Sequence, residues 1–312
     1  MAPRFADLPP LMDPVETSPS SESSAPRFSP VERRDAISYE EFFRVYAMGR
    51  RPVVIRGQAL WTGAEPFGVQ ILRERCGTKR LADLQSGIGG DIGLTDEQLA
   101  RYRTLGGYLD ALEAAVAKGG THDVPYLTTV DIAASFPELV PDIQPPKYFL
   151  PNWISRVFAS AASYTIGELF IGPPSTPFGC LHFDKWRVHV GTCQLLGRKQ
   201  WWLFPPEESK HLYAKPNHWY PHLSPVDVRA PDLKKYPLFA KARGFTTVLE
   251  PGDILFCPDS WWHETQNLEL SIATAVRIAN RSNAVDAMVD YVRSRIVDYH
   301  VDRYHEVLSR RR

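Results

Sequence analysis

Between about residues 164 and 280 the chain is a series of short β-type segments, and this pattern constrains the fold more than any other feature. The segments are rich in β-branched and aromatic residues, and Pro and Gly fall between them. They are 164–171 (YTIGELFI), 199–204 (KQWWLF), 245–249 (FTTVL), 253–256 (DILF) and 271–276 (SIATAV). Many short strands with turns between them are typical of an all-β barrel or sandwich.

Helical signals lie on both sides of this β-rich part. A capping-box pattern at 38–41 (SYEE) opens a short apolar stretch, and helical spacing returns over 66–118 and again over 284–308. The segment 51–57 (RPVVIRG) is predicted to be a strand that Gly57 ends. We therefore expect a mainly β fold with N-terminal and C-terminal helical additions.

The chain divides into three parts by composition. Residues 1–30 are dense in Pro, Ser and Glu, and we expect a flexible leader there, because such a segment buries too little apolar surface to order itself. Residues 31–282 are predicted to form one domain in which an α/β elaboration precedes the β-rich part. Residues 283–312 are predicted to be a C-terminal helix.

Charge and apolar content argue against two classes of partner, nucleic acid and membranes. The 36 basic and 36 acidic residues cancel, so no overall field attracts nucleic acid. The sequence has no apolar run of about 18 residues and no secretory signal pattern, so no membrane partner is expected. These observations predict a soluble protein of the cytoplasm or, in a eukaryote, of the nucleus.

Cysteine use points to reduced thiols. The four cysteines are too sparse for a disulfide framework and form no C-x-x-C pair. We expect buried thiols, and neither disulfides nor a zinc ribbon.

The residues that suggest chemistry are two histidines and a carboxylate. His182 and Asp184 are two positions apart, so on an extended strand both side chains would point to the same face. His263 follows the turn and strand signals of 251–256. One carboxylate and two imidazoles are the facial triad that leaves three positions open on non-haem Fe(II), although imidazole also suits zinc.

Lys199 is the second unusual feature. Strand alternation places it on the same face as Trp201 and Leu203, the face more suited to burial. A lysine directed into an apolar barrel is unfavourable unless an anion meets it, and the distal carboxylate of 2-oxoglutarate would be such an anion. On the other reading this strand face is outside and Lys199 is solvated.

These residues lie within a longer resemblance to the JmjC, or cupin-8-like, hydroxylases, which covers roughly residues 35–280. The matching segments occur in the family's order: 51–57 (RPVVIRG), 170–174 (FIGPP), 197–206 (GRKQWWLFPP), 231–239 (PDLKKYPLF), 250–256 (EPGDILF) and 261–263 (WWH). The resemblance implies a double-stranded β-helix of the jelly-roll or cupin type. It also implies that His182, Asp184 and His263 bind Fe(II), that Lys199 binds 2-oxoglutarate, and that O₂ is the co-reactant.

The sequence departs from the family pattern at one cosubstrate position. Members often carry Thr or Ser three residues before the first histidine, where this chain has Gly179. Thr192, Thr176 and Tyr164 are the candidates to supply the missing hydroxyl, and each also fits an ordinary structural role.

Four further residues are candidates for substrate contact. Lys185, Trp186 and Arg187 directly follow Asp184, where an aromatic ring between two cations could contact an anionic or aromatic substrate or form a solvated rim. Trp262 adjoins His263, but Trp201, Trp202, Trp261 and Trp262 are more typical of core residues. The other nearby histidines, His189, His211, His218 and His222, are predicted to lie in loops or at the surface.

The leading functional hypothesis is an Fe(II)- and 2-oxoglutarate-dependent dioxygenase that hydroxylates a protein side chain or a small molecule. One alternative is a tRNA-base hydroxylase of the wybutosine-pathway type, which the neutral net charge disfavours. The other is a metal-binding cupin that does not use 2-oxoglutarate, in which Lys199 would have no function. The C-terminal helix could pack on the barrel or, as in similar hydroxylases, form a homodimer interface.

Overall fold

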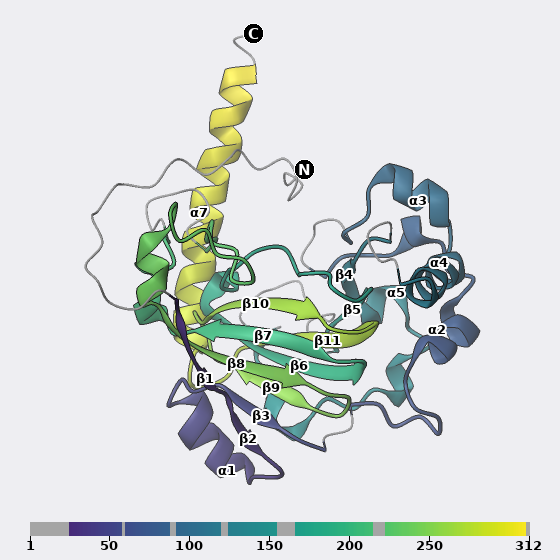
Figure 1. The fold of residues 1–312 in the computed structure, drawn as a ribbon, viewed down its shortest axis with the longest axis horizontal. Helices are drawn as coiled ribbons and strands as arrows, with labels where there is room; N and C mark the ends of the chain where they lie inside the picture. Colours follow the sequence, from purple (N-terminus) through teal and green to yellow (C-terminus); the bar gives the residue numbers. More distant parts are fainter. Residues whose placement is uncertain are drawn as a thin grey trace.

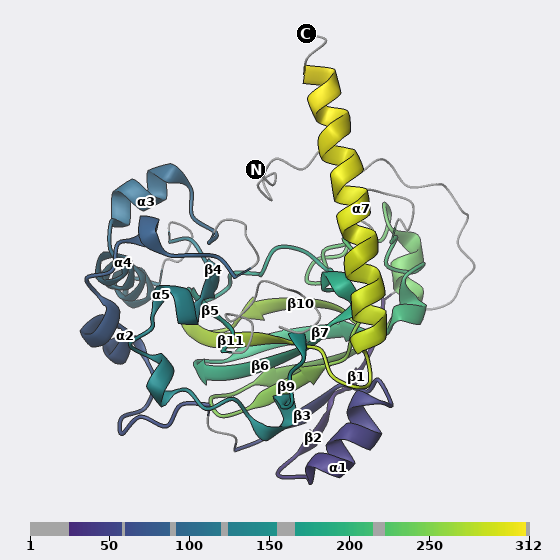
Figure 2. The same ribbon diagram turned by 180° about the vertical axis from the view of Figure 1, so that it is seen from behind.

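Two β-sheets that face each other form the body of the protein in the computed structural model (Figures 1 and 2). The structure describes residues 25–57, 60–87, 92–119, 124–154, 166–214 and 222–309, and side chains up to residue 296. The smaller sheet has the order β1 (Arg27–Pro30), β8 (Arg243–Leu249), β7 (Lys199–Phe204), β10 (Trp262–Asn267). The larger has the order β2 (Glu32–Arg34), β3 (Val53–Ile55), β9 (Ile254–Cys257), β6 (His189–Leu196), β11 (Ser271–Ile278), β5 (Glu168–Gly172), β4 (Leu127–Asp131). The mainly β prediction is confirmed, and the fold is consistent with a jelly roll.

Alternation along the strands separates the inside of the barrel from its outside. On β7, Lys199, Trp201 and Leu203 are buried on the inner face, the intervening Gln200 and Trp202 are less buried, and Phe204 at the strand end is buried in a separate apolar cluster. Trp201 and Leu203 join one apolar cluster with residues of the opposite sheet, such as Leu255. The predicted inward orientation of Lys199 is therefore confirmed.

Helices cover the outer face of the larger sheet. Near β4 and β5 lie α2 (Val69–Cys76), α3 (Asp96–Tyr102), α4 (Leu105–Ala117) and α5 (Ile132–Ser135), as Figure 1 shows. Their apolar side chains pack in one cluster with those of β5 and β11, including Leu169 and Ile272. At the other end, α1 (Tyr39–Glu41) continues into the π-helical segment η2 (Phe42–Ala47), which packs on β3 and β9.

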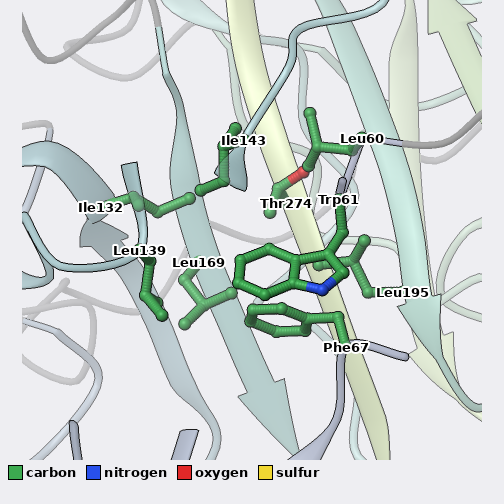
Figure 3. A pocket seen from close by; sticks show the side chains of 9 residues that line it. All are labelled: Leu60, Trp61, Phe67, Ile132, Leu139, Ile143, Leu169, Leu195 and Thr274. Atoms are coloured by element: carbon green, nitrogen blue, oxygen red, sulfur yellow. The ribbon is translucent and has the colours of Figure 1, made fainter. Parts of the chain in front are cut away.

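Between this helical layer and the sheet lies a small apolar cavity of about 10 Å³ (Figure 3). The surface that the lining residues present to this cavity is entirely apolar. A space of this size holds about one water molecule. It is therefore a packing defect rather than a substrate site.

The C-terminal helix α7 (Ala284–Ser309) rises from the barrel and extends away from both sheets (Figures 1 and 2). Its first turns contact the 3₁₀ segment η7 (Lys185–Arg187). The remaining 3₁₀ segments are η3 (Leu81–Asp83), η4 (Val140–Asp142), η5 (Lys147–Phe149), η8 (Pro206–Glu208) and η9 (Pro237–Lys241). Within the described ranges, no helix combines the length and the apolar content that crossing a membrane requires.

Three expectations differ from the observed elements. Residues 27–30, assigned to the leader, form β1, because the backbone of β8 supplies a parallel partner that local composition does not reveal. Residues 182–184 lie outside the named strands, and His182 forms only isolated bridges with Leu223 and His263. His189 is not a loop or surface residue: it begins β6, and its side chain is fully buried.

Candidate metal centre

His182 and His263 are joined through their backbones. The N–H of His182 donates to the carbonyl oxygen of His263 at 3.1 Å, and the N–H of His263 donates to the carbonyl oxygen of His182 at 2.6 Å. Because residues paired in this way project their side chains to the same side, the two rings lie with their centroids 4.4 Å apart. Two ligands 81 positions apart in sequence are thus brought together by one bridge.

Asp184 completes the group. His182, Asp184 and His263 each offer one ligand atom, and these atoms all lie within 4.8 Å of one another. Asp184 Oδ2 is 3.3 Å from His263 Nε2. Among the described residues this is the one group of three His, Cys, Asp or Glu side chains that could hold a metal ion.

Each ring also makes a hydrogen bond through Nδ1 to a backbone carbonyl oxygen, and this bond fixes the tautomer that metal binding needs. Nδ1–H of His182 donates to the carbonyl oxygen of Cys180 at 2.8 Å, and Nδ1–H of His263 donates to that of Trp261 at 3.1 Å. A carbonyl oxygen only accepts, so each Nδ1 carries the proton. Each Nε2 then keeps a lone pair for a metal, an arrangement common among metal-ligating histidines.

The charge states suit a divalent cation. Burial and the nearby His263 lower the pKa of His182 to about 4, so its imidazole is neutral at pH 7. Burial alone would raise the pKa of Asp184, but His263 and Arg277 hold it below its usual value. A neutral imidazole at His182 and an ionised carboxylate at Asp184 are ligand forms that a 2-His-1-carboxylate site requires.

Arg277 is a neighbour of this group that the sequence did not single out. Its Nη1 donates to Glu168 Oε1 at 2.8 Å, and its Nε lies 3.7 Å from Asp184 Oδ1. Arg277 and Ala275 occupy the same face of β11, and Glu168 pairs with Ala275. The alternation used for Lys199 could have flagged Arg277 too, as a charge at an inward position of a strand.

Lys199 lies inside the barrel with 3% of its surface exposed. Its Nζ donates to Tyr126 Oη at 2.8 Å and sits over the rings of Tyr126 and Phe170 at 5.5 and 5.8 Å. Burial lowers its pKa to about 7. Burial is the sole cause of this shift, and no carboxylate of the described residues contributes to it. Tyr126 was missed because nothing in its local sequence marks it.

Lys199 and the metal group lie along one pair of strands. In the antiparallel pairing of β7 with β10, Lys199 is opposite Asn267 and Leu203 is opposite His263. The lysine is thus four positions from His263, about 13 Å along the strand. An extended dicarboxylate and a lysine side chain together suit this separation.

The region from residue 39 to residue 278 matches the family model of the Cupin-like domain. The chain belongs to this JmjC-type, cupin-like family. It is similar to tRNA wybutosine-synthesizing protein 5 of Gallus gallus, with 29% identity over 78% of this chain and 74% of that protein. It is also similar to lysine-specific demethylase 8 of Danio rerio, with 30% identity over 76% of this chain and 55% of the relative.

A shorter stretch of this cupin-like chain resembles another protein. HSPB1-associated protein 1 of Rattus norvegicus is 39% identical over 103 residues, which are 32% of this chain and 21% of the relative. The chain therefore spans about half of the demethylase and about a fifth of this protein.

The three hydroxyl candidates for the cosubstrate site have different positions in the cupin-like barrel. Thr192 is buried on β6, in the alternation that also turns Val190 inward. Thr176 donates to the carbonyl oxygen of Pro173 at 2.6 Å and accepts from Asn267 Nδ2 at 3.1 Å, so its hydroxyl is engaged locally. Tyr164 lies outside the described residues.

The substrate candidates are less suited to their expected roles. The indole of Trp186 packs edge-on against Tyr291 of α7, and its Nε1–H donates to Ser294 Oγ at 3.0 Å. Lys185 and Arg187 on either side are exposed. Trp262 is 1% exposed, packs against Phe183 and donates from Nε1 to Ser209 Oγ, as a core residue would.

Of the remaining histidines, His211 and His222 are partly buried and lie outside the named helices and strands, as predicted. His222 packs against Phe183 and its backbone carbonyl accepts from the Phe183 N–H, so it adjoins the metal group. Burial lowers its pKa to about 3. His211 Nδ1 lies 2.7 Å from Glu208 Oε2, and His218 lies outside the described residues.

Proposed function

We propose that this chain is an Fe(II)- and 2-oxoglutarate-dependent oxygenase that hydroxylates a C–H bond of a protein side chain or a small molecule. The proposal rests on two features that lie together in the interior of the barrel. One is the His182, Asp184 and His263 group, and the other is a buried Lys199 that has no carboxylate partner within the described residues. The first suits a divalent metal, and the second suits an anion.

In the proposed site each residue has a defined part. His182, Asp184 and His263 would hold iron on one side and leave its other positions open. The iron, when bound, supplies the oxidative decarboxylation of 2-oxoglutarate that is coupled to hydroxylation of the substrate. Lys199 Nζ and Tyr126 Oη would donate to the distal carboxylate, and Arg277 would hold the Asp184 carboxylate in place. The apolar rings of Phe170 and Tyr126 exclude water from the lysine.

Succinate formation tests this proposal. Purified protein with Fe(II), 2-oxoglutarate and O₂ should form succinate slowly without a prime substrate, and His182→Ala should abolish it. Lys199→Met, which keeps the length of the side chain and removes its charge, should still bind Mn(II) but lose 2-oxoglutarate binding. Tyr126→Phe removes one hydrogen bond and should raise the KM for 2-oxoglutarate about five- to tenfold, as expected for about 1 kcal/mol.

A matched control separates the site from general packing. Tyr148 is a buried tyrosine whose hydroxyl donates to the carbonyl oxygen of Ile37 at 2.9 Å, outside the barrel interior. Tyr148→Phe should leave the KM unchanged. If Lys199→Met turned over with a wild-type KM, the cosubstrate site would be wrong even with a correct metal centre. Metal binding without succinate formation would favour the cupin that does not use 2-oxoglutarate.

A second candidate is hydroxylation of a tRNA base. It is favoured by the similarity to a tRNA wybutosine-synthesizing protein along 78% of this chain. The zero net charge counts against it, because nucleic-acid affinity rests largely on neutralised phosphates. Bulk tRNA should accelerate succinate formation if the chain hydroxylates a tRNA base. It should have no effect if the substrate is a protein side chain or a small molecule.

A further inference from the structure

The loop that directly follows Asp184 has an unusual backbone. Trp186 (φ 67°) and Arg187 (φ 46°) are consecutive non-glycine residues in the left-handed region. Side chains disfavour this conformation, which persists only where surrounding contacts hold it. One residue, Lys185, separates this strained pair from Asp184.

The contacts that hold the loop come from α7. The backbone N–H of Trp186 donates to Asp290 Oδ2 at 3.0 Å, and the indole N–H donates to Ser294 Oγ at 3.0 Å. The ring of Trp186 meets that of Tyr291 edge-on at 5.5 Å. Asp290, Tyr291 and Ser294 lie on adjacent turns of one helix face. Three residues of α7 thus hold both the backbone and the side chain of Trp186.

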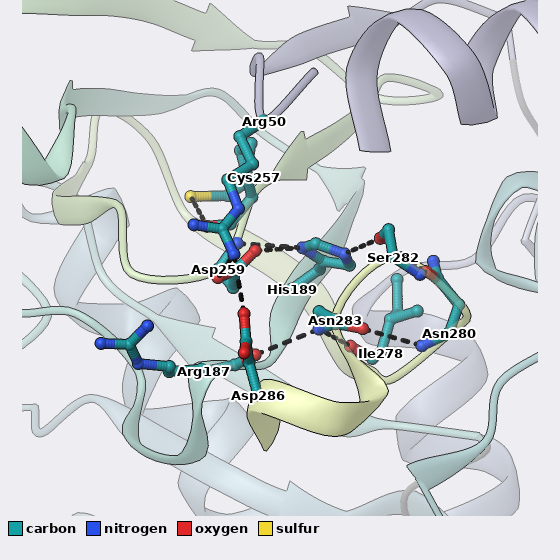
Figure 4. A network of polar contacts seen from close by, with 11 residues as sticks. Arg50, Arg187, His189, Cys257, Asp259, Ile278, Asn280, Ser282, Asn283 and Asp286 are labelled. Atoms are coloured by element: carbon teal, nitrogen blue, oxygen red, sulfur yellow. Dashed lines mark hydrogen bonds and ion pairs between the residues drawn. The ribbon is translucent and has the colours of Figure 1, made fainter. Parts of the chain in front are cut away.

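The start of α7 is in turn fixed to the barrel (Figure 4). Asn283 Nδ2 donates to the carbonyl oxygen of Arg187 at 3.1 Å, and Asp286 pairs with Arg50 at 3.1 Å. Arg50 also lies 3.3 Å from the buried Asp259. The helix is therefore anchored independently of its contacts with Trp186.

We infer that α7 positions the metal ligand Asp184, with Asp290 as the positioning residue that acts through the backbone of Trp186. This inference rests on the proposed metal site and goes beyond it, because no residue of α7 belongs to the group of ligands. A metal ligand must be held within about 0.5 Å of its working position. Arg277 restrains the Asp184 carboxylate from the barrel side, and Asp290 restrains the chain that follows it.

Mn(II) affinity, measured by electron paramagnetic resonance without cosubstrate, tests the inference. Asp290→Ala removes the acceptor for the Trp186 N–H and should weaken Mn(II) binding about 10- to 100-fold, the range typical for residues that orient a metal ligand. Asp290→Asn keeps an acceptor oxygen and should restore most of the affinity. Trp186→Phe keeps the ring against Tyr291, loses the indole N–H, and should weaken binding several-fold.

Asp286→Ala is the matched control. It removes a carboxylate from the same helix one turn earlier and leaves Arg50 beside Asp259, so it should destabilise the chain without affecting Mn(II) binding. Thermal unfolding of the metal-free variants reports any difference in stability. Equal weakening by Asp286→Ala and Asp290→Ala would show that α7 only stabilises the fold, and would overturn the inference.

The remaining outcomes separate the inference from the proposed function. If wild type and His182→Ala bound Mn(II) equally well, the metal centre itself would be wrong. If His182→Ala abolished binding while Asp290→Ala bound as wild type does, the metal centre would stand and the positioning role of α7 would fall. Should Asp290→Ala not fold, Asp290→Asn with Trp186→Phe answers the same question, because wild-type affinity in Trp186→Phe would contradict the inference.

Discussion

Lys199 is the residue whose placement is hardest to explain without a ligand. Its ammonium group lies in the barrel, where it contacts the hydroxyl of Tyr126 and the aromatic rings of Tyr126 and Phe170. Burial disfavours the charged form, and the pKa falls from 10.5 to about 7. A dicarboxylate that reaches this group would favour the charged form and raise the pKa again. Binding of the anion and binding of a proton are therefore coupled.

This coupling gives a measurable prediction. At pH 8 Lys199 is mostly neutral in the free protein, so binding of 2-oxoglutarate to the Mn(II)-loaded protein should take up between half a proton and one proton. At pH 6 the lysine is already charged, and the uptake should be near zero. Calorimetric titrations in buffers with different ionisation enthalpies measure it. Lys199→Arg carries a permanent charge and should bind without uptake at either pH; uptake that is the same in Lys199→Arg would exclude Lys199 as its source.

At the scale of elements, the sequence predicted strands that contain runs of β-branched, aromatic and other apolar residues. The predicted segments around 199–204, 245–249, 253–256 and 271–276 all correspond to strands of the structure. β6 and β10 were not predicted as strands. β10 reads Trp-His-Glu-Thr-Gln-Asn, and β6 holds a glycine and three polar residues, His189, Thr192 and Gln194, so neither strand shows the usual apolar alternation. The polar residues of the site therefore break the alternation by which a strand is recognised in a sequence.

The sequence likewise predicted some residues of the candidate site and missed others. Ligand chemistry and spacing brought His182, Asp184, His263 and Lys199 forward, and the structure groups the first three. Arg277 reaches the site from β11, where strand alternation could have indicated it, whereas Tyr126 precedes β4 and is revealed only by its contact with Lys199. Trp186 was a candidate either for substrate contact or for a solvated rim, and its ring packs on α7, whose docking position the sequence did not specify.

The misassigned His189 shows how β6 is tied to its neighbours. Its Nδ1 accepts from the N–H of Asp259 at 2.9 Å, and its Nε2–H donates to Ser282 Oγ at 2.9 Å (Figure 4). Ser282 in turn donates to Asn280 Oδ1 at 2.7 Å, so its hydroxyl is not activated toward the histidine. The ring acts as a structural link between β6, the turn before β10 and the start of α7.

This link predicts an acid-sensitive fold. Burial lowers the pKa of His189 from 6.5 to about 3, so below about pH 6.5 the unfolded chain takes up a proton that the folded chain refuses. The free energy of unfolding should then fall by up to about 1.4 kcal/mol per pH unit on acidification. His182 and His222, with pKa values of about 4 and about 3, add to the slope in the metal-free protein.

Urea unfolding of the metal-free protein at pH 7.5, 6.5 and 5.5 measures the slope. His189→Asn keeps an acceptor for the Asp259 N–H and cannot titrate, so its unfolding free energy should be lower at pH 7.5 and should depend less on pH. An unchanged slope in His189→Asn would assign the acid sensitivity to other groups.

At the scale of the whole molecule, α7 is notable because the barrel leaves many of its apolar side chains exposed. One stripe of its side chains is exposed: Val285 at 78%, Met288 at 39%, Val289 at 63%, Val292 at 49% and Ile296 at 55%. The spacing of three and four residues places them on one helix face, opposite to the contacts with Trp186. An apolar stripe on a helix that extends from the body is unfavourable in water and suits a second helix of the same kind.

We therefore expect two copies of the chain to associate through α7. A two-fold pair of helices would cover Val289 and Val292 of both copies, because such an interface uses the same patch twice. Light scattering should give twice the mass of the 35.3 kDa chain, and Val289→Asp with Val292→Asp should halve it. Met48→Asp, which changes an isolated exposed residue outside α7, should leave the mass unchanged. A monomeric wild type at all concentrations would mean that the stripe has another occupant. Because Asp290 and Ser294 face the barrel while Val289 and Val292 face away, the dimer-breaking variants should keep their Mn(II) affinity unless pairing itself holds α7 in place.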